Sequence, residues 1–154
     1  MLSFAFGSSF ILSRDALGIA AQTDTSRMME KVTGIGGLFF RAHDPKALRV
    51  WYQQHLGISL TPSSEGDPVW EQEAGPTVFA PFPETSKYFG DAQKVWMLNF
   101  RVRDLDKMVA QLQASGIAVK IDPQSYPNGR FARLHDPEGN PIELWQPAKP
   151  GAPH

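Results

Sequence analysis

The sequence predicts an α+β protein made of two consecutive βαβββ modules. Three observations support this. The segment Phe40–Asp44 resembles Phe100–Asp104 at an offset of 60 residues, which indicates an internal repeat. Each copy is followed by a helical pattern of apolar residues, and each pattern ends at a Gly-Ile pair, Gly57 in the first copy and Gly116 in the second. Short apolar runs separated by turn residues follow each helix, as expected for strands.

The composition fits an ordinary globular chain and excludes several classes of protein. The 154 residues include 15 Lys and Arg against 16 Asp and Glu, so the net charge of -1 argues against a general nucleic-acid binder. The absence of Cys excludes disulfides, thiolate catalysis and Cys-ligated metal sites. No apolar run is long enough to span a membrane, and residues 1–31 do not have the order of regions found in a signal peptide. We expect a cytoplasmic protein.

The chain divides into an extension, one domain and a tail. Residues 1–31 differ from the rest, with Phe residues interrupted by Gly and Ser and followed by a polar stretch, and are predicted to be disordered or loosely packed. A single domain is expected over residues 32–148. It consists of a first module (33–82), a connector (83–94) and a second module (95–147), and a short tail (149–154) follows the domain.

The first module begins with a run of strand type over residues 35–42. Asp44 is a suitable N-cap and Pro45 a suitable first helical residue, because proline needs no hydrogen-bond acceptor there. Leu48, Trp51, Tyr52, His55 and Leu56 then fall on one helix face, and Gly57 suits the helix end. Three short strands are expected near 58–61, 68–73 and 77–81.

The second module repeats this order. A strand is expected over residues 95–102, and Asp104 precedes a helix that ends at Gly116. The residues of one helix face are Leu105, Met108, Val109 and Leu112. The later strands are expected near 117–121, 129–135 and 142–146, with a dense turn signal at 136–140 between the last two.

These motifs resemble the vicinal oxygen chelate superfamily, which contains glyoxalases, bleomycin-resistance proteins and extradiol dioxygenases. The resemblance rests on Phe39–Asp44, Asn99–Asp106 and above all Asp136–Leu144, and it extends over about residues 33–147. It implies curled mixed sheets around an open cleft, the glyoxalase/bleomycin resistance/dihydroxybiphenyl dioxygenase fold. It does not by itself imply one activity, because the superfamily hosts several chemistries.

In the metal-using relatives, the first and last strands of each module supply the ligands. The corresponding positions here are Gly37, Val78, Met97 and Glu143. Three of these four have no side-chain oxygen or nitrogen, whereas divalent metals need several such donors. We therefore expect no metal and no other cofactor, with a divalent metal as the less favoured alternative.

Strand alternation predicts which side chains face the cleft. The resulting candidate ligand-binding residues form an aromatic and apolar pocket with a few polar groups. They are Phe39, Arg41, Met97, Asn99, Arg101, Glu143 and Trp145. In such a pocket Asn99 would hydrogen-bond a carbonyl or hydroxyl group, and the two Arg residues would hold a carboxylate or phosphate.

Structural roles compete with these assignments. Arg41 and Arg101 lie near strand ends, where they would pair with surface acids. If the 136–140 turn closes a hairpin, Arg133 and Glu143 would form a cross-strand ion pair. His135, with Glu143, is a weak catalytic candidate, because histidine titrates near neutrality, but His135 adjoins a turn, which favours a structural or exposed role instead.

The function favoured by these patterns is binding of a small aromatic or amphipathic molecule without metal and without turnover. The alternative is a metal-dependent lyase, isomerase or dioxygenase of the same superfamily, in which Glu143 acts as a base or ligand. An accessory module with no ligand is a third possibility. The aromatic content of so small a chain also favours a homodimer. No nucleic-acid or membrane partner is expected.

Overall fold

The computed structural model describes residues 30–59, 62 and 64–149. Contacts between Cα atoms divide the chain into two units, Met1–Phe39 and Phe40–His154. Nearly all of the predicted extension 1–31 and tail 149–154 lies outside the described residues. In the first unit the described residues 30–39 form neither helix nor strand, and the side chain of Phe39 is 94% exposed. The helices and strands of the described residues all belong to the second unit.

The helix α2, Pro45–Leu56, begins and ends where the sequence predicts. The carboxylate of Asp44 accepts hydrogen bonds from the main-chain N–H groups of Lys46 and Ala47, at 3.1 and 3.0 Å. These groups have no partner inside the helix, so the cap stabilises its first turn. Gly57 ends the helix in the left-handed region with φ of 69°, where a residue with a Cβ would be strained.

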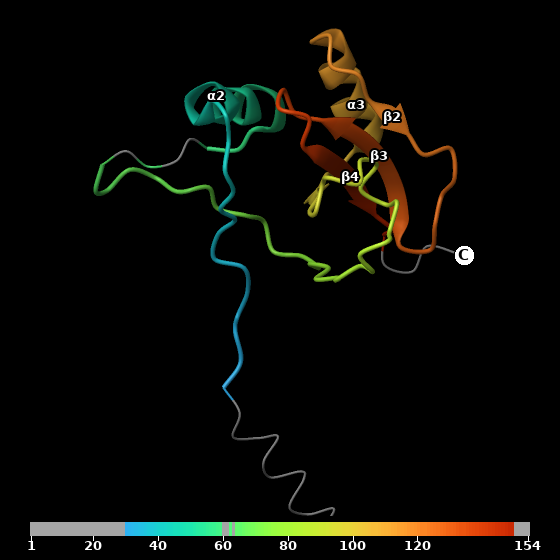
Figure 1. Ribbon diagram of the computed structural model, residues 1–154, viewed down its shortest axis with the longest axis horizontal. Coiled ribbons are helices and arrows are strands. Elements are labelled where there is room, and N and C mark those ends of the chain that lie inside the picture. The colour runs from blue at the N-terminus through green and yellow to red at the C-terminus, as the bar shows by residue number, and fades with distance from the viewer. Residues whose placement is uncertain (1–29, 60–61, 63, 150–154) are drawn as a thin grey trace, which may run out of the picture. The chain divides into compact units, whose positions relative to one another are not determined.

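The second half of the chain forms a four-stranded mixed sheet (Figure 1). Its strands are β1 (Leu98–Arg101), β2 (Lys120–Ile121), β3 (Gly129–His135) and β4 (Pro141–Pro147). Within the sheet they lie in the order β1-β4-β3-β2. β1 runs parallel to β4, and the other pairs are antiparallel. The helix α3, Leu105–Ala114, connects β1 to β2 and packs on β3 and β4. The α+β class and the elements predicted for the second module are confirmed.

One face of the sheet carries the hydrophobic core. Ile142 and Leu144 of β4 are fully buried together with Leu105 and Leu112 of α3. Tyr52 of α2 joins the same cluster. Because alternate residues of a strand point to opposite faces, β4 directs its intervening residues away from this core. In the described part of the chain, no helix is both long and apolar enough to cross a bilayer.

The strands expected in the first half do not form within the described residues between 30 and 97. The segments near 68–73 and 77–81 lack strand pairing and are exposed, and the side chains of Val78 and Phe79 are 71% and 89% accessible. Apolar patterning predicts a strand only if a neighbouring strand pairs with it, and pairing is a long-range property that local sequence does not supply.

Two glutamates, one in each half of the domain, link the halves crosswise. Glu138, in the β3–β4 turn, accepts the main-chain N–H groups of His43 and Asp44 at 2.9 and 2.8 Å, just before α2. Glu73 pairs with the guanidinium of Arg103, just before α3. Each repeat therefore contacts the residues that directly precede the N-terminus of the other repeat's helix.

Candidate functional site

The candidate site lies on the sheet face opposite the core. Glu143 sits in the middle of β4, directly beside Asn99 of β1 and Arg133 of β3 in the strand register. The side chains of these three residues form a polar row across the sheet. Glu143 is only 4% exposed, so its charge is stabilised by protein donors in place of most of its water.

Three donors surround the carboxylate of Glu143. The amide Nδ2 of Asn99 donates to Oε1 at 2.8 Å. The phenol of Tyr88 and the Nε of Arg133 donate to Oε2 at 2.8 and 3.3 Å. The predicted cross-strand ion pair between Arg133 and Glu143 is therefore confirmed.

Tyr88 comes from the connector and was not predicted to belong to the site. Its ring stacks on the ring of Phe82, with centroids 4.9 Å apart, and also meets the guanidinium of Arg133, whose carbon is 4.2 Å from the ring centre. Burial, followed by the hydrogen bond to Glu143, raises the pKa of the Tyr88 phenol above its usual value. The phenol therefore stays protonated and donates at neutral pH.

A second row of side chains lies beside the polar row. Trp145 pairs in register with Arg101 of β1 and Phe131 of β3, on the same face as Glu143. The rings of Phe131 and Trp145 are nearly parallel, with centroids 6.3 Å apart, and the indole N–H donates to the carbonyl of Asn128 at 2.8 Å. The face thus combines a polar row with an aromatic row.

The structure brings together some of the candidate residues but not others. Asn99, Glu143 and Trp145 lie on neighbouring strands, and Met97 is a half-buried residue just before β1. Arg101 instead donates to the main-chain oxygen of Glu73 at 2.7 Å. This hydrogen bond to a main-chain oxygen is neither the pocket role nor the pairing with a surface acid that the sequence predicted for Arg101.

The remaining candidates are Arg41, Phe39 and His135. Arg41 is exposed at the start of the second unit, and Phe39 belongs to the other unit. His135 is exposed at the end of β3, where it pairs in register with Pro141 at the hairpin turn. Glu143 lies two register positions further along the hairpin, where its partner is Arg133 and not His135.

The donor set around Glu143 does not fit a divalent metal. Its carboxylate already interacts with the positive charge of Arg133, and its other partners are an amide and a phenol. Two of the corresponding ligand positions are Val78 and Met97, whose side chains are poor ligands for such ions. Within the described residues, no three His, Cys, Asp or Glu side chains gather as metal ligands would.

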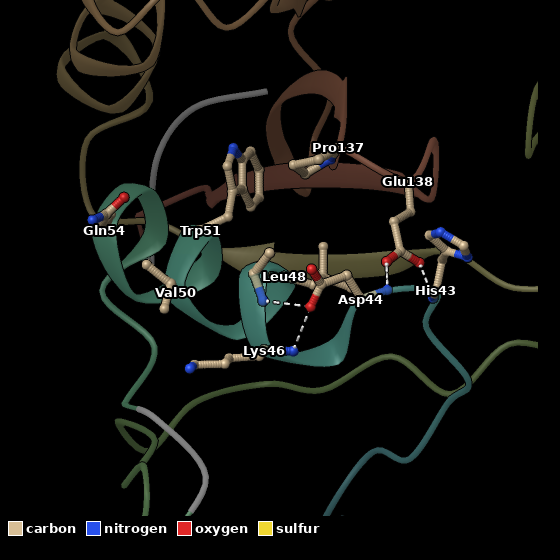
Figure 2. Close-up of a pocket in the computed structure, with 10 residues that line it drawn as sticks. His43, Asp44, Lys46, Leu48, Val50, Trp51, Gln54, Pro137 and Glu138 are labelled. Carbon is tan, nitrogen blue, oxygen red and sulfur yellow. Dashed lines mark hydrogen bonds between the residues drawn. The ribbon is translucent and has the colours of Figure 1, made fainter.

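An open groove of about 630 Å³ lies beside α2 (Figure 2). Trp51 and Pro137 line its apolar part, and Asp44 and Glu138 are its acidic residues. Figure 2 shows both carboxylates turned to main-chain N–H groups at the start of α2. These acids therefore hold the helix to the hairpin turn, and the groove has no member in common with the Glu143 cluster.

Comparison with known proteins identifies the family. The model of the glyoxalase-like domain matches residues 37–145. The chain belongs to the glyoxalase-like domain family. This membership confirms the resemblance to the vicinal oxygen chelate superfamily. No curated protein matches the sequence of this glyoxalase-like chain.

Solved structures share the glyoxalase-like fold. TnmS3, an antibiotic binding protein from Streptomyces sp. CB03234, aligns with a TM-score of 0.53 and 22% identity, covering 78% of this chain and 100% of its own. A protein from the mobile metagenome of V. Pseudocholerae aligns at 0.54 and 15% identity, covering 79% and 100%. A glyoxalase/bleomycin resistance protein/dioxygenase from Nocardioides aligns at 0.50 and 23%, covering 89% and 98%. At these identities the likeness establishes the fold alone.

Proposed function

We propose that this glyoxalase-like protein binds a small aromatic or amphipathic molecule without a metal ion. The observation that carries the proposal is the pair of rows on the sheet face opposite the core. Glu143 with Asn99 and Arg133 offers hydrogen-bonding groups, while the ring of Phe131 and the buried ring of Trp145 form the aromatic row. A mostly apolar surface with a few fixed polar groups is typical of sites for small organic ligands.

Two further points support binding over metal-dependent catalysis. The carboxylate of Glu143 is neutralised by Arg133 and hydrogen-bonded by neutral donors, so a cation there would compete with an existing ion pair. TnmS3, which shares the fold, is an antibiotic binding protein. Binding of an organic molecule is therefore the function that the arrangement of side chains favours.

A thermal-shift series with metal analysis tests this proposal. Uncharged aromatic compounds are expected to raise the melting temperature of the wild-type protein, because a ligand that binds only the folded state stabilises it. Divalent ions are expected to leave the melting temperature unchanged. The Glu143→Gln variant is expected to lose no metal on purification. An equimolar, tightly bound metal that this substitution removes would overturn the proposal, as would an aromatic series that causes no shift at all.

We further infer that the protein is a homodimer. The exposed segments near residues 69 and 79 are rich in apolar side chains, among them Val69, Trp70, Val78 and Phe79. Large apolar side chains exposed in this way are often covered by a partner. Light scattering coupled to gel filtration is expected to give twice the chain mass of 17.1 kDa. A monomeric mass at all concentrations would contradict the inference. The cytoplasmic location stays a prediction.

A further inference from the structure

The connector reaches the sheet chiefly through one residue, Tyr88. Within residues 83–94 the hydrogen bonds between main-chain groups are local turns, such as Ser86 to Pro83 and Gly90 to Lys87. Tyr88 contacts the hairpin through its phenol and through its main-chain carbonyl, which accepts from Nη1 of Arg133 at 3.1 Å, and Lys94 donates to Asn140 at 3.3 Å. A segment held by so few contacts can separate from the sheet at small cost in free energy.

Tyr88 covers the carboxylate that the proposed ligand would need. Tyr88 is 36% exposed, whereas Glu143 beneath it is 4% exposed. Its phenol donates to Oε2 of Glu143, and its ring meets the guanidinium of Arg133 and stacks on Phe82. A molecule that enters this site therefore has to replace three interactions at once.

The three interactions define what can replace the phenol. The carboxylate of Glu143 accepts hydrogen bonds and repels anions, so the entering group must carry a donor and no negative charge. The guanidinium of Arg133 and the ring of Phe82 both favour contact with an aromatic ring. A neutral aromatic ring that carries a hydroxyl group meets all of these requirements.

We propose that Tyr88 acts as a built-in competitor for the ligand, and that the ligand is a neutral hydroxyaryl compound whose hydroxyl group takes the place of the Tyr88 phenol on Glu143. This proposal rests on the proposed binding function and narrows it to one ligand class. The ligand binds only when Tyr88 has left the site. Its apparent affinity is therefore the intrinsic affinity multiplied by the fraction of molecules in which the site is open.

Isothermal titration with 2-naphthol tests the exchange, and 2-methoxynaphthalene serves as the matched probe without a hydrogen-bond donor. The Tyr88→Phe variant keeps the aromatic ring at position 88 but loses the hydrogen bond to Glu143. The state in which the connector has left the site therefore becomes more populated. We expect 2-naphthol to bind this variant about twofold more tightly than the wild type, because Glu143 keeps two other donors and the lost hydrogen bond is partly exposed. In the wild type, 2-naphthol should bind about tenfold more tightly than its methyl ether.

Tyr126→Phe is the control variant. Tyr126 also donates its phenol to a carboxylate, that of Asp122 at 3.0 Å, but it does not contact Glu143. Its affinity for 2-naphthol is expected to equal that of the wild type.

Two results would overturn the competitor role while leaving the binding function intact. One is equal affinity of 2-naphthol for the wild type and Tyr88→Phe. The other is equal affinity of 2-naphthol and its methyl ether for the wild type. If neither probe binds any of the three proteins, and the aromatic thermal-shift series is also flat, the binding function fails and the inference fails with it.

Discussion

Two tyrosine–carboxylate pairs sit on the same C-terminal hairpin and differ in what holds the tyrosine. Tyr52 donates to Asp136 at 2.9 Å, and Tyr88 donates to Glu143 at 2.8 Å. Tyr52 belongs to α2 and is packed into the core, with 7% of its surface exposed. Tyr88 belongs to an irregular segment and remains 36% exposed.

The comparison shows that one type of hydrogen bond can serve two purposes. The carboxylate of Asp136 also accepts the main-chain N–H groups of Glu138 and Asn140 and the side-chain amide of Asn140. Every partner there is fixed, so the Tyr52 pair joins α2 to the hairpin permanently. At Glu143 one partner is mounted on a segment that can leave, so that pair can be exchanged for a ligand.

The largest effect is expected when the fixed pair is broken. Asp136→Ala leaves the phenol of Tyr52 and three N–H groups without their acceptor in a buried place. Because each unsatisfied buried group costs on the order of 1–3 kcal/mol and water can reach only some of them, we expect a loss of about 3 kcal/mol in the free energy of unfolding. Urea denaturation followed by circular dichroism measures it.

Asp122→Ala is the matched control for this substitution. Asp122 also accepts a tyrosine phenol and a main-chain N–H, but in an exposed loop. Its removal is expected to cost about 0.5 kcal/mol or less. Equal losses for the two alanine variants would contradict the structural role assigned to Asp136.

A smaller effect is expected when each tyrosine is replaced by phenylalanine and the losses in the free energy of unfolding are compared. Tyr52→Phe removes one buried hydrogen bond and is expected to lower the free energy of unfolding by about 1–1.5 kcal/mol. Tyr88→Phe is expected to lower it by about 0.5 kcal/mol or less, because Glu143 keeps Asn99 and Arg133 as partners. If Tyr88→Phe proves the more damaging change, the connector is a structural element and the comparison is wrong.

The smallest effect appears only in alkaline solution. Burial, and then the negative charge and hydrogen bond of Asp136, raise the pKa of Tyr52 above its ordinary value near 10. A raised pKa means that the stabilisation from the neutral phenol is fully present below about pH 10 and is lost as the pH rises further. The melting temperature is therefore expected to hold between about pH 7 and 9 and to fall above 10. Tyr52→Phe should fall less steeply over the same range.

The helices and the last hairpin were predictable because local signals determine them. Asp44 and Gly57 bound α2 through interactions with residues a few positions away, and the turn at 136–140 places Arg133 opposite Glu143. The strands expected near 68–73 and 77–81 depend on partners distant in the sequence. Their apolar patterning therefore could not establish that they pair.

The candidate site was only partly predictable. Strand alternation placed Asn99, Glu143 and Trp145 on one face, because alternation is a geometric property of every strand. Tyr88 was missed because its connector has no periodicity that assigns a side chain to a face. The aromatic residues Phe82, Tyr88 and Phe89, close together in an otherwise polar stretch, were the signal that could have indicated it. The partner of Arg101 was equally inaccessible, because it is a main-chain oxygen 28 residues away.

The crosswise glutamates have a consequence for any half-length version of this protein. Glu138 binds the entrance of α2, and Glu73 binds Arg103 at the entrance of α3. A fragment made from one repeat would carry a glutamate whose target is missing. Two complementary fragments would each supply the partner that the glutamate of the other fragment needs. In the intact chain, both of these contacts are made within a single polypeptide.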